Sequence, residues 1–196
     1  MHTSDEAWGE VHKAAALLSG MGIPYVLAGS LAGSMQGAPR TTNDADLLVS
    51  PFPGREAEFT EGFGPEYYLS LPAIIHANQR RSSFNVINTL TSFKLDFFVQ
   101  KQRPFDVSAL ARRQSRYVPE GATQSTDILS PEDLVLSKLE WYRMGGEVSD
   151  RQWKDVVEIL EANWPQLDQA YLGHWAASLK VHDLLPVALE QAATSG

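Results

Sequence analysis

The feature that most constrains this fold is a short apolar run that stops abruptly at a glycine and a serine. Residues 25–28, Tyr-Val-Leu-Ala, have the composition of a buried strand and lead directly into Gly29-Ser30. Small, helix-compatible residues follow up to Gln36. A glycine at such a junction permits close backbone approach, and the free N–H groups that open the helix can bind a phosphate. A Gly-Ser pair after a strand is also commonly a simple turn, so the junction alone leaves both interpretations open.

Two aspartates mark the next predicted strand, which covers residues 44–49. Side chains alternate along a strand, so Asp44 and Asp46 leave the same face, and the apolar residues at 45, 47 and 49 leave the other. Two adjacent carboxylates repel each other unless a positive charge lies between them. Mg²⁺, held by carboxylates and by substrate phosphate oxygens, supplies such a charge. An Asp-x-Asp pair standing alone is also typical of a solvated strand edge.

A third aspartate, Asp96, interrupts the apolar strand predicted near residues 93–100, where it shares a face with Lys94 and Phe98. A lone acid in the centre of a strand is unfavourable without a partner. If this strand lies beside the one that carries Asp44 and Asp46, the three carboxylates converge. They would then hold one or two metal ions, or one would take the proton from an attacking hydroxyl. Taken alone, Asp96 is equally well explained as a salt-bridged surface acid.

The remaining patterns divide the chain into an α/β core at residues 1–118 and a helical unit at 119–196 packed against it. Ser130-Pro131-Glu132-Asp133 opens a helix in the expected order, with a capping serine, a proline and then acids. The stretch 65–82 shows no clear pattern, and 119–127 has the composition of a polar connector. Further helices are expected over residues 5–20, 54–63, 106–113, 130–144 and 149–162, with two more before 193, and a strand over 83–88.

Composition narrows the class of protein. A chain of 196 residues, 43% of them hydrophobic and 20% charged, is typical of a globular protein that buries about 70% of its unfolded surface. The absence of cysteine excludes disulfides, thiolate metal sites and a cysteine nucleophile. We see no signal-peptide pattern and no apolar run long enough to span a membrane, so we expect a cytoplasmic protein. The net charge of −8 argues against broad nucleic-acid binding and suits a cationic small substrate.

Taken together, residues 26–33 and 40–49 resemble the signature of the nucleotidyltransferase superfamily related to DNA polymerase β. That signature is a Gly-Ser turn, a short helix and a strand with Asp-x-Asp, and Asp96 matches its later, apolar-flanked acid. The resemblance implies a nucleotidyltransferase fold of the α/β (α+β) class, with a mixed central sheet flanked by helices and a C-terminal helical unit. Within the superfamily, the chain looks most like the small bacterial proteins of the AbiEii toxin-like group.

The C-terminal part carries the narrower resemblance through residues 129–134, Lys138-Leu139 and 151–156. In that group a helical lysine and a later aspartate accompany the catalytic acids, which here implies Lys138 and Asp155. Helical periodicity independently places Lys138 inside an apolar arc, where it either extends its charge outward or reaches a nucleotide phosphate. Periodicity alone makes Asp155 a surface acid that projects away from the packed stripe of its helix. The apolar arc comprises Leu134, Val135, Leu139, Trp141 and Tyr142, and the packed stripe comprises Trp153, Val156, Val157 and Leu160.

The resemblance implies transfer of a nucleoside monophosphate from an NTP to an unidentified acceptor, with Mg²⁺ or Mn²⁺ as cofactor and release of pyrophosphate. It implies metal ligation by Asp44, Asp46 and Asp96, and nucleotide binding by Gly29, Ser30, Lys138 and Asp155. Arg40 either contacts phosphate from its loop or is simply solvated. The acceptor is a small molecule or an RNA; in the second case the arginines at 80–81 and 112–116 supply basic patches, and an antitoxin is a possible partner. The alternatives are a non-catalytic nucleotide-binding protein of the same fold and a purely structural α/β domain.

Overall fold

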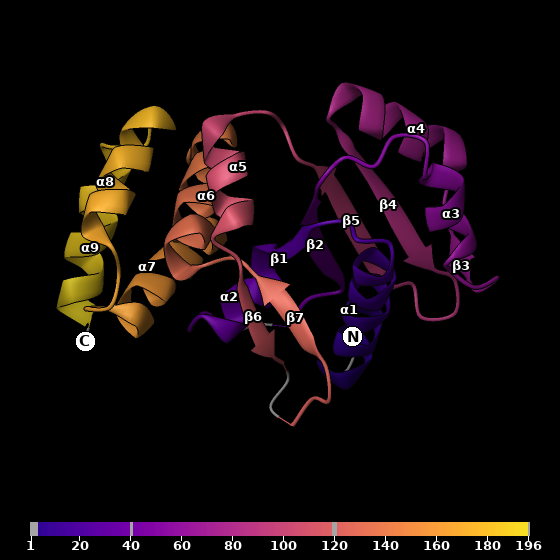
Figure 1. The fold of residues 1–196 in the computed structure, drawn as a ribbon. Coiled ribbons are helices and arrows are strands. Elements are labelled where there is room, and N and C mark those ends of the chain that lie inside the picture. The colour runs from indigo at the N-terminus through magenta and orange to yellow at the C-terminus, as the bar shows by residue number, and fades with distance from the viewer. Residues whose placement is uncertain (1–3, 40, 119–120, 196) are drawn as a thin grey trace. The chain divides into compact units, whose positions relative to one another are not determined.

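A seven-stranded mixed sheet organises the first part of the chain (Figure 1). The computed structural model describes residues 4–39, 41–118 and 121–195. The strand order is β3-β4-β5-β2-β1-β7-β6, with parallel pairing between β2 and β5 and between β1 and β7, and antiparallel pairing elsewhere. The strands are β1 (Tyr25–Ala28), β2 (Asp44–Val49), β3 (Tyr67–Tyr68), β4 (Ser83–Asn88), β5 (Lys94–Val99), β6 (Gln114–Tyr117) and β7 (Ser125–Ile128).

The chain separates into two compact units, and the boundary differs from the one expected after residue 118. Unit 1 comprises residues 1–31 and 41–128, and unit 2 comprises residues 32–40 and 129–196. Residues 114–118 and 121–128 stay with the sheet because β6 pairs with β7 and β7 pairs with β1. The short helix α2 (Gly29–Met35) begins in unit 1 and ends in unit 2.

Strict alternation along β2 and β5 creates the core face of unit 1. Both strands bury every second residue, and the apolar members of that set are fully buried. On the neighbouring β4, Phe84 stacks on Phe97 of β5, with ring centroids 4.9 Å apart and planes 4° apart. Phe59 of α3 (Glu56–Glu61) meets both rings edge-on, at 5.7 and 5.3 Å. The side chains between the buried positions therefore leave the sheet on its other face.

Helices with local start and stop signals complete unit 1. In α1 (Ser4–Gly20) the buried residues Ala7, Val11, Ala14 and Leu18 recur at helical spacing, as predicted. The helix ends at Gly20, and Gly22 adopts φ +64°. The last two helices are α4 (Leu71–Arg80) and α5 (Pro104–Ala111).

The structure contains regular elements within two segments for which the sequence predicts none. The stretch 65–82 contains β3 and α4, whose first turn is capped by the Ser70 hydroxyl accepting from the Ala73 N–H at 3.4 Å. The connector expected over 119–127 ends in β7. Strand β3 has only two residues, and β7 is a four-residue strand with three polar side chains, so these strands carry little periodic signal.

Unit 2 consists of four helices together with the end of α2. Each of the first three begins at a capping side chain, as predicted for Ser130 and Ser149 and found also for Asp168. Helix α7 contacts both α6 and α9. Gly37 lies so close to α7 that an added Cβ would be 2.1 Å from the Cβ of Ala162. The four helices are α6 (Pro131–Met144), α7 (Asp150–Asn163), α8 (Gln169–Ser178) and α9 (Leu184–Ser195).

Among the described residues, no helix combines the length and the apolar character that crossing a membrane requires.

Candidate active site

The parallel pairing of β2 with β5 gathers charged side chains on the face of the sheet opposite the phenylalanine core. Asp46 lies opposite Asp96, and Asp44 lies opposite Lys94, in an unbroken register. Neighbouring residues in register point to the same face, so three carboxylates and one ammonium group share this face. All four residues are partly buried. We call Asp44, Asp46 and Asp96 the carboxylate cluster; the sequence predicts its convergence only if the two strands are neighbours, and they are.

Gly29 closes one side of the carboxylate cluster. The antiparallel pairing of β1 with β2 places Ala28 opposite Asp46, so the backbone of the next residue, Gly29, runs beside the Asp46 carboxylate. Its φ is +63°, a left-handed backbone conformation that residues other than glycine rarely adopt. A Cβ at this position would lie 1.8 Å from Asp46 Oδ2. Both the backbone conformation and the limited space therefore require glycine at position 29. The next residue, Ser30, is buried.

Lys94 neutralises part of the negative charge of the cluster. Its Nζ lies 2.6 Å from Asp96 Oδ2, with side-chain exposures of 38% and 19%. The hydrogen bond to Asp96 raises the pKa of the Lys94 ammonium; partial burial opposes this, and the charges of Asp96, Asp44 and Asp46 add to the increase. On the other side of the cluster, Thr42 donates a hydrogen bond to Asp44 Oδ1. The sequence places Lys94 on this face by alternation, but gives it no role.

The donor set of the carboxylate cluster fits a hard divalent cation. Carboxylate oxygens are the ligands that Mg²⁺ and Mn²⁺ prefer, and the close backbone of Gly29 leaves the cluster bounded by peptide rather than by a side chain. In residues 4–39, 41–118 and 121–195, no group of three or more acidic or histidine side chains has the arrangement of a metal site. The ion pair between Lys94 and Asp96 engages one of the three carboxylates.

A second charged pair lies inside unit 2. Lys138 of α6 donates to Asp155 Oδ2 of α7 at 2.7 Å, and the two side chains are only 5% and 7% exposed. Lys138 lies within the packed face of α6, as predicted. The surface position predicted for Asp155 is wrong: its partner on the adjacent helix holds it in the interior, which helical periodicity cannot register. Trp141, expected in the apolar arc, is instead 52% exposed.

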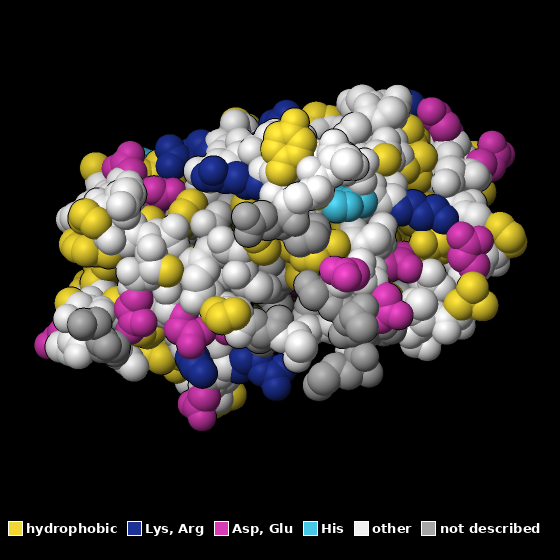
Figure 2. Space-filling view, turned by 90° about the horizontal axis from the view of Figure 1, so that it is seen from below, with side chains coloured by type: hydrophobic (Ala, Val, Ile, Leu, Met, Phe, Trp, Pro, Cys, Tyr) yellow, Lys and Arg dark blue, Asp and Glu magenta, His cyan; other side chains and the backbone are white. Residues whose placement is uncertain are grey.

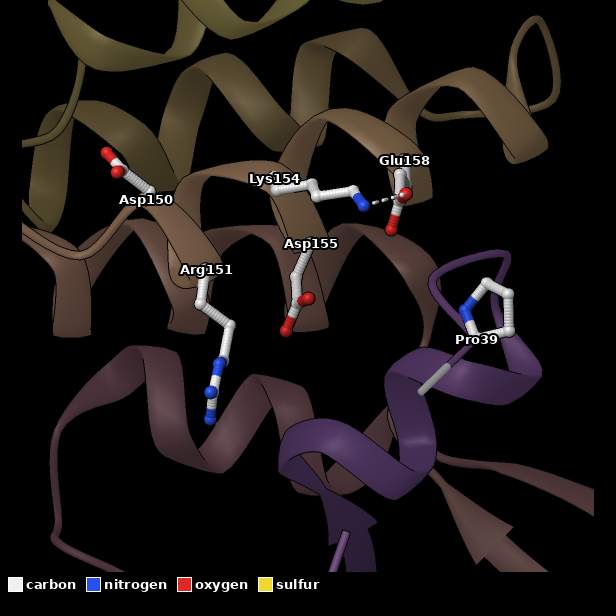
Figure 3. A pocket seen from close by; sticks show the side chains of 6 residues that line it. All are labelled: Pro39, Asp150, Arg151, Lys154, Asp155 and Glu158. Carbon is white, nitrogen blue, oxygen red and sulfur yellow. Dashed lines mark ion pairs between the residues drawn. The ribbon is translucent and has the colours of Figure 1, made fainter. Parts of the chain in front are cut away.

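Asp155 also lines a pocket of unit 2 with a volume of about 350 Å³ (Figure 3). Arg151 and Asp155 point to the same side of α7, whereas Lys154 points along the helix toward Glu158, with Nζ 3.5 Å from Oε1 (Figure 3). The volume is within the range of small-molecule sites, and the lining offers charges of both signs. The lining residues are Pro39, Asp150, Arg151, Lys154, Asp155 and Glu158.

The remaining residues expected to bind nucleotide or RNA are arginines. Arg40 lies outside the described residues. In the expected basic patches, Arg113 is paired with Asp127 at 2.8 Å, and Arg81 donates to the Gln100 carbonyl at 3.1 Å. On the face drawn in Figure 2, the described acidic and basic side chains stand in small separate groups (Figure 2). Two arginines of the expected patches therefore bind partners within the chain.

The mixed α/β fold with its seven-stranded sheet is that of nucleotidyltransferase-like proteins, as the sequence predicts. An antigenic nucleotidyltransferase-like protein from Paracoccidioides brasiliensis aligns with a TM-score of 0.59 and 19% identity, over 96% of this chain and 94% of that one. Two structures of ANT(2'')-Ia each give a TM-score of 0.49. The complex with adenylyl-2''-tobramycin is 14% identical over 88% of this chain and 95% of its own. The solution structure of this antibiotic-resistance factor is 17% identical over 97% of this chain and 100% of its own. No protein-family model and no curated protein matches the sequence.

Proposed function

We propose that this protein is a metal-dependent nucleotidyltransferase that moves a nucleoside monophosphate from an NTP to an acceptor hydroxyl or similar group. The observation that carries the proposal is the register of β2 and β5, which sets Asp46 opposite Asp96 and keeps Asp44 on the same face. The fold shared with nucleotidyltransferase-like proteins supports it. In such a transfer the acceptor oxygen bonds to the α-phosphorus, the bond to the β-phosphate oxygen breaks, and pyrophosphate leaves.

Asp44, Asp46 and Asp96 are the residues proposed to hold Mg²⁺ or Mn²⁺. When bound, the metal neutralises triphosphate charge and stabilises the charge that develops during transfer. Asp96 would either complete a second metal site or accept the proton of the attacking hydroxyl. The acceptor proton would then pass to the Asp96 carboxylate as the new phosphoester bond forms.

Other residues of the chain are proposed to bind the nucleotide. Gly29 leaves its backbone accessible, and together with the Ser30 hydroxyl it would hold the β- and γ-phosphates. Lys138 and Asp155 are also proposed as nucleotide-binding residues; within unit 2 their ammonium and carboxylate bind each other at 2.7 Å. Arg40 is the remaining residue proposed to contact phosphate.

A small cationic acceptor is the favoured substrate class. The net charge of −8 attracts cations and repels nucleic acid. Of the arginines proposed to bind RNA, Arg113 and Arg81 are held by Asp127 and by a backbone carbonyl. A toxin-like enzyme of the AbiEii group that modifies RNA, with an antitoxin as partner, is the alternative, and assays with tRNA and with a panel of aminated small molecules separate the two.

The test is a titration of labelled NTP in the presence of Mg²⁺, with pyrophosphate release as the second measurement. We expect the Asp44→Ala/Asp46→Ala variant to lose metal-dependent binding and pyrophosphate release. The control is Asp5→Asn/Glu61→Gln, which also removes two negative charges from unit 1, at exposed positions. Equal binding by the wild type and the Asp44→Ala/Asp46→Ala variant would overturn the proposed function.

A further inference from the structure

The position of Lys94 relative to the carboxylate cluster carries an inference about how the site is loaded. Lys94 is the Cα partner of Asp44 across the β2–β5 pair, and its ammonium lies 2.6 Å from Asp96, the partner of Asp46. The ammonium interacts electrostatically with all three carboxylates. One positive side chain thus engages the group of charges that the proposed metal ion would neutralise.

We propose that Lys94 is a resident counterion that competes with the divalent metal for the carboxylate cluster. The inference rests on the proposed function, because it takes the cluster as the metal site. Asp96 Oδ2 accepts the Lys94 hydrogen bond, so a metal ion ligated through that oxygen would meet the ammonium charge at close range and compete with it for the oxygen. Removing the ammonium exposes three carboxylates to their mutual repulsion, and a bound cation restores the balance.

The competition has two consequences. Without metal, Lys94 stabilises unit 1 by offsetting like-charge repulsion on one face of the sheet. With metal, the same ammonium weakens binding, since it competes with the metal ion for the Asp96 oxygen. Loss of the lysine therefore lowers the stability of the metal-free protein and raises its affinity for metal, a pair of opposite effects that a merely structural lysine would not produce.

The variant that tests this is Lys94→Met, which keeps the length of the side chain and removes its charge. The interaction of two unit charges about 4 Å apart changes an equilibrium constant by roughly fivefold in water and up to about a thousandfold near a protein surface. We expect Mn²⁺ alone, followed by electron paramagnetic resonance, to bind Lys94→Met about tenfold or more tightly than wild type. Mn²⁺ should also raise the thermal midpoint of this variant more than that of wild type.

Two further variants separate charge from position. Lys94→Arg keeps a positive charge and should bind Mn²⁺ within about threefold of wild type. Lys101→Met removes the charge of an exposed lysine in the same unit, beyond the far end of β5. Lys101 lies seven residues further along the chain, at most about 23 Å from Lys94, so the Mn²⁺ affinity of this variant should change much less than that of Lys94→Met.

The outcomes distinguish this inference from the proposed function. Tighter Mn²⁺ binding by Lys94→Met but not by Lys101→Met supports the competition. If wild type and Lys94→Met bind Mn²⁺ equally, the competition is overturned while the metal site stands. If neither binds Mn²⁺, both the competition and the proposed metal site are overturned. Should Lys94→Met fail to fold without metal, Lys94→Gln provides the same measurement, and equal affinity there likewise refutes the inference.

Discussion

Replacing Gly29 with alanine tests the contact that closes the carboxylate cluster. The new methyl group would lie 1.8 Å from Asp46 Oδ2 and 2.6 Å from its Cγ, and the backbone would have to keep φ at +63°. Gly22 offers a matched control, because its φ is +64° and a Cβ there would meet nothing within 4 Å. Both glycines belong to unit 1. Gly22→Ala therefore measures the backbone effect alone, and Gly29→Ala measures the backbone effect plus the clash with Asp46.

The expected magnitudes follow from these two contributions. A left-handed φ destabilises an alanine relative to glycine by about 1 kcal/mol, which is the whole effect expected for Gly22→Ala. Crowding a packed site adds about 1–3 kcal/mol, so Gly29→Ala should lower the free energy of unfolding by about 2–4 kcal/mol. For a chain of this size, that corresponds to a fall in thermal midpoint of roughly 4–16 °C.

Urea unfolding of the two single variants and of Gly29→Ala/Asp46→Ala provides the measurement. In the Asp46→Ala background the oxygen and carboxyl carbon that would clash are absent and only the Cβ of residue 46, at 2.9 Å, remains, so adding Gly29→Ala should cost about 1–2 kcal/mol. The reasoning is wrong if the free energies of unfolding of Gly29→Ala and Gly22→Ala differ by less than about 0.5 kcal/mol. A difference that small is within the scatter expected for sites that do not interact. It is also wrong if the Asp46→Ala background leaves the effect of Gly29→Ala unchanged.

Three further predictions concern other parts of the chain. Lys138→Met leaves Asp155 buried without its partner and should destabilise by about 3–5 kcal/mol in urea unfolding, whereas Lys138→Met/Asp155→Leu should cost less than the single change. Burial and the hydrogen bond to Glu10 at 2.6 Å raise the pKa of Tyr67 above its ordinary value of 10.0. The hydroxyl of Tyr67 therefore stabilises the fold fully below pH 10, and this contribution declines as the pH rises from 10 through the higher folded pKa. The difference in free energy of unfolding between wild type and Tyr67→Phe should narrow above pH 10. A difference that stays constant would refute this. Phe59→Ala opens a cavity beside the two β-strand phenylalanines and should cost about 3–5 kcal/mol, measured by thermal unfolding; a loss below about 1 kcal/mol would show that the site collapses or was loosely packed.

Elements with strong local signals were predicted closely from the sequence. The strands at 25–28 and 44–49 begin and end as expected. The first is an apolar run directly between Pro24 and Gly29, and the second is a strictly alternating run that ends two residues before Pro51. Helix α6 begins one residue after its capping serine. These boundaries depend on interactions between residues close in the chain, which a sequence displays directly.

Elements that depend on distant partners were missed. Strand β6 pairs with β7, across a segment expected to be a connector, and its own four side chains are exposed or only partly buried. Helical periodicity predicts a surface position for Asp155, because an acid in an amphipathic helix normally faces water, but Lys138, 17 residues away, is buried with it. Lys94 received no role, since only pairing in register brings it onto the carboxylate cluster.

The sequence by itself determined the alternation that puts Asp44 and Asp46 on one face of a strand, because a strand repeats every two residues whatever lies beside it. Only the tertiary structure decided that β5 lies next to β2, parallel and in a register that sets Asp96 opposite Asp46 rather than one residue away. A slip of one residue would turn every side chain of β5 to the other face and bury the acid in the phenylalanine core. The packing of those phenylalanines against α3, which involves residues far apart in the chain, selects this register.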